Sequence, residues 1–431
     1  MPPPPEATSG TIAVIGAGHV GLVTAAGFVH HGRRVAVGEA DPERLAMLRS
    51  GVMPFREPGL ADIVSTGVDQ GLLTFHGDNA EAAAGAVAVF VAVPTPPGEG
   101  GAADLSMVEA AVRSIASVVS APTPIVLKSS VPPGSWVAIT GLLAAAGCDC
   151  PLVVNPEFLQ EGRAVTDVLQ PARVVLGGTD AEAVRLVADL HRPFAAEVVS
   201  TDPASAELAK YAANAYLATR LSFANVVARA AAAFGADVED VLRAVSLDPR
   251  IGPHYFRPGP GYGGSCFPKD LPALVRAASE RGLDLALIRA VIDTNDTQAD
   301  WVIGMVVEAL GDPAGATVGL LGLAFKGGTD DTRTSPAVTL ASRLAERGVR
   351  VRAYDPQARV ALEGVEQVDE ALEAARGADL LLVATEWREF TGLDFSRLAG
   401  VMNGSVVIDA RNLLDPEAVR AAGLDYRGLG R

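Results

Sequence analysis

The sequence predicts an α/β protein with two Rossmann-like, doubly wound domains joined by a central helical domain that contains a long helix. From residue 11 to about residue 200, short runs rich in β-branched residues alternate with alanine-rich stretches. This alternation is typical of βαβ units and a parallel sheet. Residues 204–235 instead form one uninterrupted helical stretch, and a second alternation of strands and helices begins after the glycine- and proline-containing break at residues 311–315.

The length of the chain supports division into several domains. Its 431 residues exceed the roughly 250–300 residues at which a single core stops growing. A hydrophobic content of 49% supplies enough apolar side chains for more than one core. We expect a proline-rich disordered tail over residues 1–10, an N-terminal Rossmann domain over 11–200, a central helical domain over 201–310 and a C-terminal Rossmann-like domain over 311–431.

The first strand, over residues 11–15, leads directly into a glycine-rich turn and then into a helical stretch over residues 22–29. In this context Gly-x-Gly-x-x-Gly predicts a dinucleotide site, because its glycines allow the turn, the approach of the pyrophosphate and close helix packing. The next strand, over residues 34–38, ends at an acidic residue that is expected to bind the ribose hydroxyls and to favour NAD over NADP. The predicted cofactor contacts in this region are Gly16, Gly18, His19, Val20, Gly21 and Glu39.

Further strands of the first domain are expected at residues 87–93, 124–128, 152–154 and 173–177. Ligand-binding loops in such a sheet lie at the carboxyl ends of the strands. In the second Rossmann-like domain, strands are expected at residues 317–323, 349–354, 380–384 and 405–408. The first turn of that domain lacks the dinucleotide pattern, so we expect it to bind a different phosphate-bearing ligand, with Lys326 as a cation.

A glycine-dense segment from Gly259 to Asp270 contains one cysteine, Cys266, followed by Lys269. A lysine near a thiol favours the thiolate, and a neighbouring carboxylate can relay protons. This combination indicates covalent catalysis, although a buried structural cysteine in a turn is the alternative. Lys210 and Asn214 are four residues apart and therefore share one face of the long helix, either as site residues or as part of a solvated face.

Composition excludes several other classes of protein. A formal net charge of -16 argues against a general nucleic-acid binder, because phosphate backbones require broad basic surfaces. The chain has only three cysteines, so we expect no disulfide framework and a location in the reducing cytoplasm. Cys148 and Cys150 are interpreted as structural residues, and no metal site is predicted. The N-terminus lacks the pattern of a signal peptide, and the longest apolar run is shorter than the ~20 residues that span a bilayer, so no membrane partner is expected.

Motifs along most of the chain resemble the UDP-glucose/GDP-mannose dehydrogenase family. Besides the glycine-rich turn and the cysteine loop, the motifs that carry this resemblance are Glu57-Pro-Gly-Leu60, Asn155-Pro-Glu-Phe-Leu-Gln-Glu-Gly162, Glu207-Leu-Ala-Lys-Tyr-Ala-Ala-Asn214, Phe325-Lys326, Thr329-Asp-Asp-Thr-Arg333 and Asp409-Ala-Arg-Asn412. They occur in the order of the family and extend from about residue 11 to about residue 415.

The resemblance implies NAD-dependent, four-electron oxidation of the carbon-6 alcohol of a nucleotide sugar to a carboxylate. UDP-glucose, giving UDP-glucuronate with two NAD per sugar, is the leading hypothesis. Cys266 would form a thiohemiacetal and then a thioester. Lys210 and Asn214 would stabilise the oxyanion, and Asp270 would relay protons through water. Glu157 would act as general acid and base in thioester hydrolysis, with Ser130 near the water.

The resemblance also implies the ligand contacts. Further cofactor contacts are Arg44, Thr95, Ser129, Ser130, Glu161, Lys269 and Arg333. Substrate contacts are Glu157, Phe158, Leu159, Lys210, Asn214, Arg250, Tyr255, Arg257, Gly263, Phe325, Lys326 and Arg411. Because the arginine matching Arg250 reaches the substrate of a neighbouring subunit in this family, a homodimer or higher assembly is expected.

Two alternatives remain open at this point. The first is a dehydrogenase of the same family that acts on GDP-mannose or another nucleotide sugar. The second, from a different class, is a catalytically silent nucleotide-sugar sensor on the same scaffold. A sensor would be expected to lack Cys266, Lys210 or Asp270, and all three are present.

Overall fold

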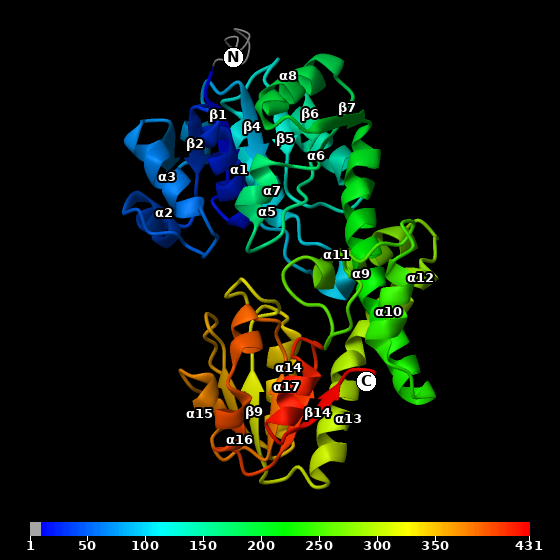
Figure 1. Ribbon diagram of the computed structural model, residues 1–431. Coiled ribbons are helices and arrows are strands. Elements are labelled where there is room, and N and C mark those ends of the chain that lie inside the picture. Colours follow the sequence, from blue (N-terminus) through cyan, green and yellow to red (C-terminus); the bar gives the residue numbers. More distant parts are fainter. Residues whose placement is uncertain (1–9) are drawn as a thin grey trace. The chain divides into compact units, whose positions relative to one another are not determined.

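The computed structural model describes residues 10–431 (Figure 1). The chain divides into two compact units. Unit 1 contains the residues up to Ala213 together with Arg276–Arg281, and unit 2 contains Asn214–Val275 and Gly282–Arg431. The tail predicted over residues 1–10 lies, apart from Gly10, outside the described residues.

Unit 1 is built on an eight-stranded sheet with the strand order β3-β2-β1-β4-β5-β6-β7-β8. Apolar side chains on alternate residues serve two cores, because successive side chains of a strand point to opposite faces. In β1, Ile12 and Val14 belong to one core, whereas Ala13 and Ile15 belong to the other. The strands are β1 (Ile12–Ile15), β2 (Val35–Gly38), β3 (Leu73–His76), β4 (Ala88–Val91), β5 (Ile125–Leu127), β6 (Leu152–Val154), β7 (Arg173–Gly178) and β8 (Glu197–Thr201).

Helices cover both faces of this sheet. The core on one face includes residues of α1, α2, α3, α7 and α8, and the core on the other includes residues of α4, α5 and α6. This is the doubly wound arrangement that places ligand sites at the carboxyl ends of the strands. The helices are α1 (His19–His30), α2 (Pro42–Arg49), α3 (Leu60–Asp69), α4 (Asn79–Ala83), α5 (Ser106–Ala116), α6 (Ser135–Ala145), α7 (Ala164–Leu169) and α8 (Ala181–His191).

The long helix α9 (Pro203–Phe234) runs through 32 residues and begins at a proline, which is tolerated in a first helical turn. Its alanine-rich face packs in unit 2, where Ala224, Ala228 and Ala231 form a small core with Val238 and Leu242 of the next helix. The helices that follow are α10 (Val238–Ser246), α11 (Phe267–Ser279), α12 (Ala286–Asp296) and α13 (Gln298–Leu310).

Unit 2 contains a six-stranded sheet in the order β11-β10-β9-β12-β13-β14, with every neighbouring pair parallel. Apolar residues of α13, α14, α15, α16 and α17 pack with these strands into one core. The strands are β9 (Thr317–Leu321), β10 (Arg350–Tyr354), β11 (Val365–Gln367), β12 (Leu380–Val383), β13 (Val406–Asp409) and β14 (Asp425–Gly428). The remaining helices are α14 (Pro336–Glu346), α15 (Ala371–Ala375), α16 (Phe395–Ala399) and α17 (Pro416–Ala421).

The predicted fold class is confirmed, with one difference in the first sheet. The strand β7 pairs with β6 in the antiparallel direction, whereas the alternation of elements predicts a parallel sheet throughout. The helix α8 and a short 3-10 helix (Arg192–Phe194) connect β7 to the parallel strand β8, so β7 and β8 form a crossover unit that joins the sheet in the reverse direction. An antiparallel edge added to a parallel sheet is common in such folds.

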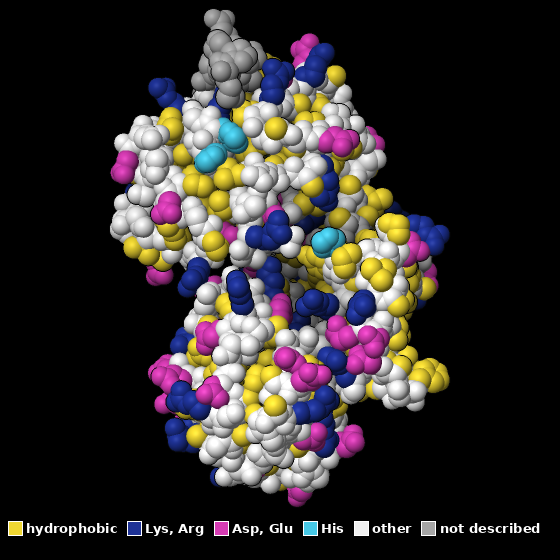
Figure 2. All heavy atoms as spheres, in the orientation of Figure 1, with side chains coloured by type: hydrophobic (Ala, Val, Ile, Leu, Met, Phe, Trp, Pro, Cys, Tyr) yellow, Lys and Arg dark blue, Asp and Glu magenta, His cyan; other side chains and the backbone are white. Residues whose placement is uncertain are grey.

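On the face drawn in Figure 2, acidic and basic side chains are interspersed instead of forming one continuous basic surface. Within residues 10–431, no helix combines the length and the apolar character needed to cross a bilayer.

Candidate active site

The glycine-rich turn after β1 has the backbone shape that a dinucleotide requires. Gly16 has a φ of 99°, and a Cβ at this position would lie 2.8 Å from the carbonyl oxygen of Ala92. A Cβ on Gly21 would clash with the carbonyl of Gly16. A Cβ on Gly18, by contrast, would meet open space, and Gly18 caps α1 without a side-chain hydrogen bond. The N-terminus of α1 is therefore open to the pyrophosphate of a dinucleotide.

Glu39, directly after β2, is buried beside this turn. One carboxylate oxygen accepts the N–H of Ala17 at 2.9 Å, and the other accepts the N–H of Asp41 at 2.8 Å. Arg44 approaches the same carboxylate at 3.2 Å. These contacts fix the carboxylate at the carboxyl end of β2, where the ribose of a dinucleotide binds. Together with the turn, they fit NAD.

Two loops that follow β4 and β5 are joined by hydroxyl groups. Thr95 donates its hydroxyl to the carbonyl of Ser130 at 2.9 Å, and Ser129 donates to the carbonyl of Val93 at 2.7 Å. Both donors are buried. The structure therefore brings together Thr95, Ser129 and Ser130 at the carboxyl edge of the first sheet.

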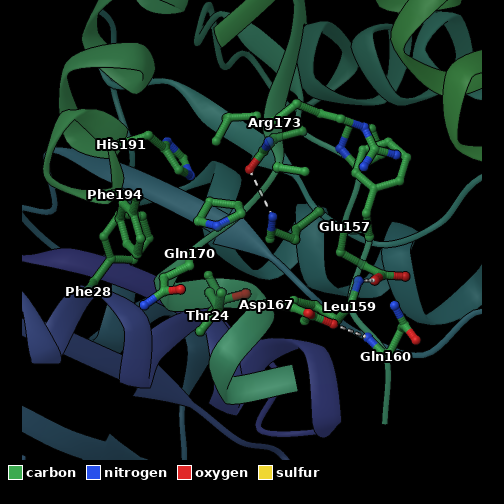
Figure 3. A pocket seen from close by; sticks show the side chains of 18 of the residues that line it. Thr24, Phe28, Glu157, Leu159, Gln160, Asp167, Gln170, Arg173, His191 and Phe194 are labelled. Carbon is green, nitrogen blue, oxygen red and sulfur yellow. Dashed lines mark hydrogen bonds between the residues drawn. The ribbon is translucent and has the colours of Figure 1, made fainter. Parts of the chain in front are cut away.

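Lys210 of α9 and Glu157, which follows β6, form a buried ion pair. Nζ of Lys210 lies 2.8 Å from Oε1 of Glu157, and the two side chains are 4% and 5% exposed. Glu157 also accepts the N–H of Leu159 at 2.6 Å (Figure 3). Burial acts to raise the pKa of Glu157, but the charge and hydrogen bond of Lys210 outweigh it and hold the pKa below its ordinary value. Glu157 is therefore a carboxylate at neutral pH, the form that accepts a proton from water.

The segment from Glu157 to Glu161 is not helical, so Glu161 does not lie one helical turn from Glu157. The next helix, α7, begins at Ala164. The segment is instead held by Glu57, whose carboxylate accepts the N–H groups of Gly162 and Ala164, each at 2.8 Å. Phe158, Leu159 and Glu161 are each partly exposed on this loop.

Glu57 also contacts the glycine-rich turn, a connection that the sequence pattern does not predict. Its Oε2 atom lies 2.9 Å from Nε2 of His19. Burial acts to raise the pKa of Glu57, but the hydrogen bonds from His19 and Gly162 lower it. Glu57 thus joins the cofactor turn to the loop that carries Glu157. The motif that contains Glu57 is part of the family resemblance, but its hydrogen-bond partners are known only from the fold.

Glu207 is a second buried carboxylate near the site to which the sequence pattern gives no role. It lies three residues before Lys210 on α9 and is 2% exposed. Its two carboxylate oxygens accept the N–H groups of Gly134 and Trp136 at 2.6 and 2.7 Å, at the beginning of α6. Burial raises the pKa of Glu207 to about 7, against the lowering effect of these hydrogen bonds. The spacing of Glu207, Lys210 and Asn214 on one helix face is the signal that could have identified it.

In unit 2, Cys266 directly precedes α11, whose N-terminus favours an anionic thiolate. The cysteine is partly exposed, which argues against the alternative of a buried structural thiol. Asp270, in the first turn of α11, is 1% exposed. Its carboxylate accepts a hydrogen bond from Nδ2 of Asn214 at 2.7 Å and pairs with Nζ of Lys269 at 2.5 Å. Cys266, Asp270, Asn214 and Lys269 are therefore neighbours within unit 2.

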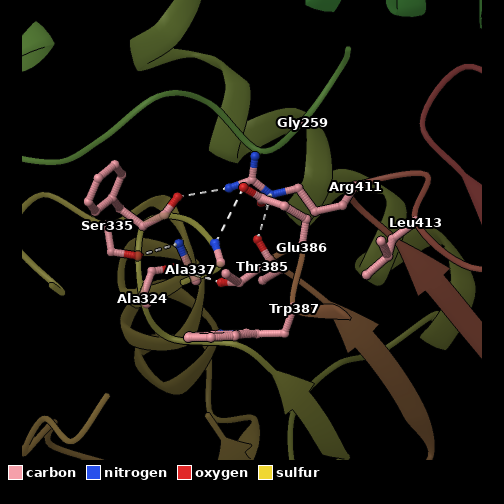
Figure 4. Close-up of polar contacts among 12 residues, drawn as sticks. Gly259, Ala324, Ser335, Ala337, Thr385, Glu386, Trp387, Arg411 and Leu413 are labelled. Atoms are coloured by element: carbon pink, nitrogen blue, oxygen red, sulfur yellow. Dashed lines mark hydrogen bonds and ion pairs between the residues drawn. The ribbon is translucent and has the colours of Figure 1, made fainter. Parts of the chain in front are cut away.

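The cysteine loop is also attached to the second sheet. The N–H of Gly264 donates to the carbonyl of Arg333 at 3.1 Å, and a Cβ on Gly264 would lie 2.8 Å from the ring of Phe325. The guanidinium of Arg411 lies beside Gly259 and Glu386 (Figure 4). It donates to the carbonyl of Phe325 at 2.9 Å. The glycines of this loop thus allow it to lie against the residues expected to bind the nucleotide of the sugar.

Other predicted residues lie more peripherally in unit 2. Arg250 is exposed and pairs with Asp248 at 2.6 Å, and Arg333 is 65% exposed and pairs with Asp331 at 2.7 Å. Arg257 is also exposed. Among the predicted substrate contacts, Tyr255, Gly263 and Lys326 are partly or wholly buried.

The remaining cysteines are both buried in unit 1. Cys148 is 5% and Cys150 is 7% exposed, and burial raises the pKa of Cys150 to about 12. A thiol that stays protonated is a poor nucleophile. Among residues 10–431, no group of three or more His, Cys, Asp or Glu side chains could hold a metal ion.

A dinucleotide turn on one sheet, a second parallel sheet and a partly exposed cysteine at a helix N-terminus indicate a nucleotide-dependent oxidoreductase. Profiles of the UDP-glucose/GDP-mannose dehydrogenase family match the chain in three parts. The NAD binding domain matches residues 10–195, the central domain residues 204–297 and the UDP binding domain residues 319–416.

Individual relatives agree with these matches. The chain is 42% identical to a UDP-glucose 6-dehydrogenase of Pseudomonas aeruginosa, with 97% of both chains covered. It is 39% identical to the UDP-glucose 6-dehydrogenase TuaD of Bacillus subtilis, covering 97% of this chain and 93% of that one. A solved UDP-glucose dehydrogenase of Pyrobaculum islandicum superposes with a TM-score of 0.92 at 37% identity and 99% coverage of both chains. The chain therefore belongs to the UDP-glucose/GDP-mannose dehydrogenase family, and it is an NAD-dependent dehydrogenase.

Proposed function

We propose that this enzyme oxidises UDP-glucose to UDP-glucuronate in two successive two-electron steps. The observation that carries the proposal is the partly exposed Cys266 at the N-terminus of α11, next to the buried Asp270–Asn214 pair. Lys210, one helical turn from Asn214 on α9, holds Glu157 as a carboxylate. A match to the UDP binding domain of the family and relatives named as UDP-glucose 6-dehydrogenases support UDP-glucose over GDP-mannose.

The proposed chemistry assigns each step to side chains of this chain. NAD, when bound, accepts the hydrides that the oxidation releases, and the residues that fit it are the glycine-rich turn and Glu39. Asp270 takes up the proton of the carbon-6 hydroxyl through water. The Cys266 sulfur adds to the resulting aldehyde to give a thiohemiacetal, whose oxidation gives a thioester. Lys210 and Asn214 stabilise negative charge on the carbon-6 oxygen.

Hydrolysis then releases the acid and restores the thiol. Glu157 accepts a proton from the attacking water, and the carbon–sulfur bond breaks as the carboxylate forms. A covalent link through Cys266 explains why the reactive aldehyde would stay on the enzyme between the two oxidations. Ser130 and Glu161, on loops of unit 1, are proposed to assist the water and the cofactor.

The stoichiometry tests this function directly. With limiting UDP-glucose and excess NAD, we expect two NADH and one UDP-glucuronate per sugar, without free aldehyde in solution. NADH is measured by absorbance, and the sugar products are measured by chromatography. One NADH per sugar would instead indicate a simple alcohol dehydrogenase. Faster turnover of GDP-mannose would assign the enzyme to the other substrate class of the family, and no turnover of any nucleotide sugar would favour a sensor.

Cofactor preference tests the role of Glu39. We expect kcat/KM for NAD to exceed that for NADP by at least about 100-fold, because a 2′-phosphate would be placed against a buried carboxylate. The variant Glu39→Gln should reduce this preference by relieving the repulsion while keeping the shape of the side chain. Equal efficiency with both cofactors in the unmodified enzyme would contradict the assignment.

We further propose that the enzyme assembles as a homodimer or a higher oligomer in the cytoplasm. All three cysteines are free, as expected for a reducing compartment. Along α9, Tyr216, Phe223 and Val226 are each about half exposed or more, at 61%, 51% and 48%. Their spacing places them on one face of the helix, and contiguous exposed apolar side chains are typical of an interface. We propose that a second copy of the chain covers this face of α9. A second copy is also needed if Arg250 is to reach the substrate of a neighbouring subunit, as the family resemblance implies.

Assembly can be tested on this face of α9. The double variant Tyr216→Lys and Val226→Lys should shift the enzyme to monomers in size-exclusion chromatography with light scattering, because charges do not tolerate burial in an apolar interface. Met107→Lys, a change at a 50% exposed apolar residue of α5, is the matched control and should leave the mass unchanged. A monomeric unmodified enzyme at micromolar concentration would refute the proposal.

A further inference from the structure

Unit 1 contains a cavity of about 260 Å³ that borders the loop of Glu157, Phe158 and Leu159 and extends to residues without a role in the steps above (Figure 3). Residues of α1, α7, α8 and β7 form its walls, and the segments that follow β5 and β6 close its inner end. Much of the wall is apolar. The apolar lining residues are Phe28, Pro156, Phe158, Leu159, Val168, Pro171, Ala172, Val174 and Phe194.

The inner end of the cavity carries a buried cation, Lys128. This side chain follows β5 and is 8% exposed. Its ammonium group has three N–H donors, and one of them donates to Oδ1 of Asn155 at 3.0 Å. Asn155 is otherwise used, because its Nδ2 donates to the carbonyl of Val175 at 2.9 Å. Within residues 10–431, Lys128 has no second acceptor for its other two N–H groups.

The side wall carries a buried acceptor, His191, at the end of α8. Nδ1 of His191 lies 2.8 Å from the carbonyl of Val187, so Nδ1 must carry the proton. Burial, together with the charge of Lys128, lowers the pKa of His191 to about 4. The ring is therefore neutral at pH 7, and Nε2 is left as an acceptor. His191 is 8% exposed, and Figure 3 shows its ring on the wall of the cavity.

The charge of the cavity is positive although the chain as a whole is acidic, with a net charge of -16. The two carboxylates in its wall each pair with another cation, although the charge of Glu157 also acts on Lys128. Glu157 pairs with Lys210 at 2.8 Å, and Asp167 pairs with Arg163 at 2.9 Å. Lys128 remains at the inner end, and Arg173 lies over the ring of Phe158 with 3.6 Å between the guanidinium carbon and the ring centre.

We propose that this cavity is a second ligand site, which binds a small carboxylic acid with a compact apolar body and a hydroxyl group. The carboxylate would pair with Lys128, whose two remaining N–H groups match its oxygens. The hydroxyl would donate to Nε2 of His191, and the apolar body would lie against Phe28 and Phe194. Among residues 10–431 the structure gives Nε2 of His191 no donor, so the hydroxyl of the ligand is a source of specificity.

Occupancy of this site would affect the reaction, a consequence that rests on the proposed function. Lys128 is one of the two cations whose charge holds Glu157 ionised. A carboxylate bound to Lys128 would offset that charge and favour a protonated Glu157. Glu157 is the proposed base of thioester hydrolysis, and the residues that would bind the acid, Lys128 and His191, are not among the proposed substrate or cofactor contacts. The acid is therefore expected to act as an inhibitor that does not compete with NAD or UDP-glucose.

Calorimetric titration with 3-hydroxybenzoate tests the site on the full chain. With saturating NAD and UDP present, we expect saturable binding with a Kd on the order of 1 mM, as is usual for a ligand of this size. Benzoate should bind at least about tenfold more weakly, because it leaves His191 without a donor. Glucuronate, an acid without an apolar body, should not bind. Displacement of 3-hydroxybenzoate by UDP, preferential binding of glucuronate, or absence of saturable heat would overturn the proposal.

Variants identify the residues responsible. Lys128→Met should weaken binding of both aromatic acids at least about tenfold, whereas Arg113→Met, which removes a 63% exposed cation from α5, should not change it. In His191→Phe the difference in affinity between 3-hydroxybenzoate and benzoate should disappear. This comparison of two ligands and two proteins remains informative if Lys128→Met does not fold. Equal effects of Lys128→Met and Arg113→Met would contradict the site. If saturating acid leaves turnover unchanged, the inhibitory role is refuted. If the unmodified enzyme releases no NADH from UDP-glucose even without the acid, the proposed function is contradicted instead.

Discussion

Replacing Cys266 by serine should lower steady-state formation of the acid by at least about 1,000-fold, while NAD and UDP-glucose still bind. A serine hydroxyl is far less acidic than a thiol and a poorer leaving group. Any ester that formed from Cys266→Ser would therefore persist on the enzyme. Steady-state NADH release measures the loss, and mass spectrometry of the intact protein measures a trapped adduct.

The matched control for this variant is Cys150→Ala, because Cys150 is 7% exposed, belongs to unit 1 and has no step assigned to it. It should retain NADH release to within a few-fold, with only a small loss of stability from the buried sulfur. Full steady-state activity in Cys266→Ser would refute covalent catalysis. A burst that stops at one NADH per subunit, or at two NADH where the serine ester forms, would support it, because the first oxidation does not require the thiol and an ester is reached only after the second oxidation.

The cofactor site could be predicted from the sequence because its parts are local. The turn from Gly16 to Gly21 follows β1 directly, and Glu39 follows β2 directly. Strand, turn and helix determine where these residues lie whatever the rest of the chain does. The same holds for Lys210 and Asn214, whose relation depends only on the period of α9. Local pattern therefore predicts both the class of cofactor and one face of α9.

Contacts between distant segments could not be predicted in this way. Glu57 lies 105 residues before Gly162, and Glu207 lies 73 residues after Gly134, yet each pair is joined by a hydrogen bond. From the sequence alone, a carboxylate on a helix or loop is expected to be an ordinary surface group, because its buried hydrogen-bond donors come from distant segments. Such groups position the cofactor turn and the loops around Glu157 and Ser130, so the support of the site emerges only with the tertiary structure.

Edge strands were missed for a different reason. The strand β8 is mostly exposed, and its sequence, Glu-Val-Val-Ser-Thr, offers a short apolar signal. β11 has three residues and is also partly exposed. Periodicity detects strands that are buried on one or both faces, so it finds the central strands and overlooks short edges. The antiparallel direction of β7 could not be predicted either, because the composition of a strand does not depend on its direction in the sheet.

Replacing Lys210 by methionine is the second change for which a large effect is expected. The Glu157 carboxylate would remain 5% exposed without its partner at 2.8 Å. Loss of one member of a buried ion pair costs about 3–5 kcal/mol in the free energy of unfolding. Loss of a donor to a developing oxyanion lowers kcat by about 100- to 1,000-fold. Lys210→Met should therefore reduce both stability and turnover.

The two losses can be separated by adding Glu157→Gln. An amide oxygen can still accept the N–H of Leu159, but the side chain carries no buried charge. The double variant should recover most of the stability lost in Lys210→Met, measured by hydrogen exchange of β5 and β6 amides, and none of the turnover. Recovery of turnover together with stability would show that Lys210 serves structure alone.

The pH dependence of stability should change sign in Lys210→Met. In the unmodified enzyme the pKa of Glu157 is lowered, so its contribution is present above the ordinary carboxyl pKa and is lost as the pH falls through the lowered value. Without Lys210, burial is the largest remaining influence, and the pKa should rise despite the nearby charge of Lys128. The variant should then lose stability as the pH increases from 5 to 8. Parallel pH profiles for the two proteins would show that the buried pair does not control the ionisation of Glu157.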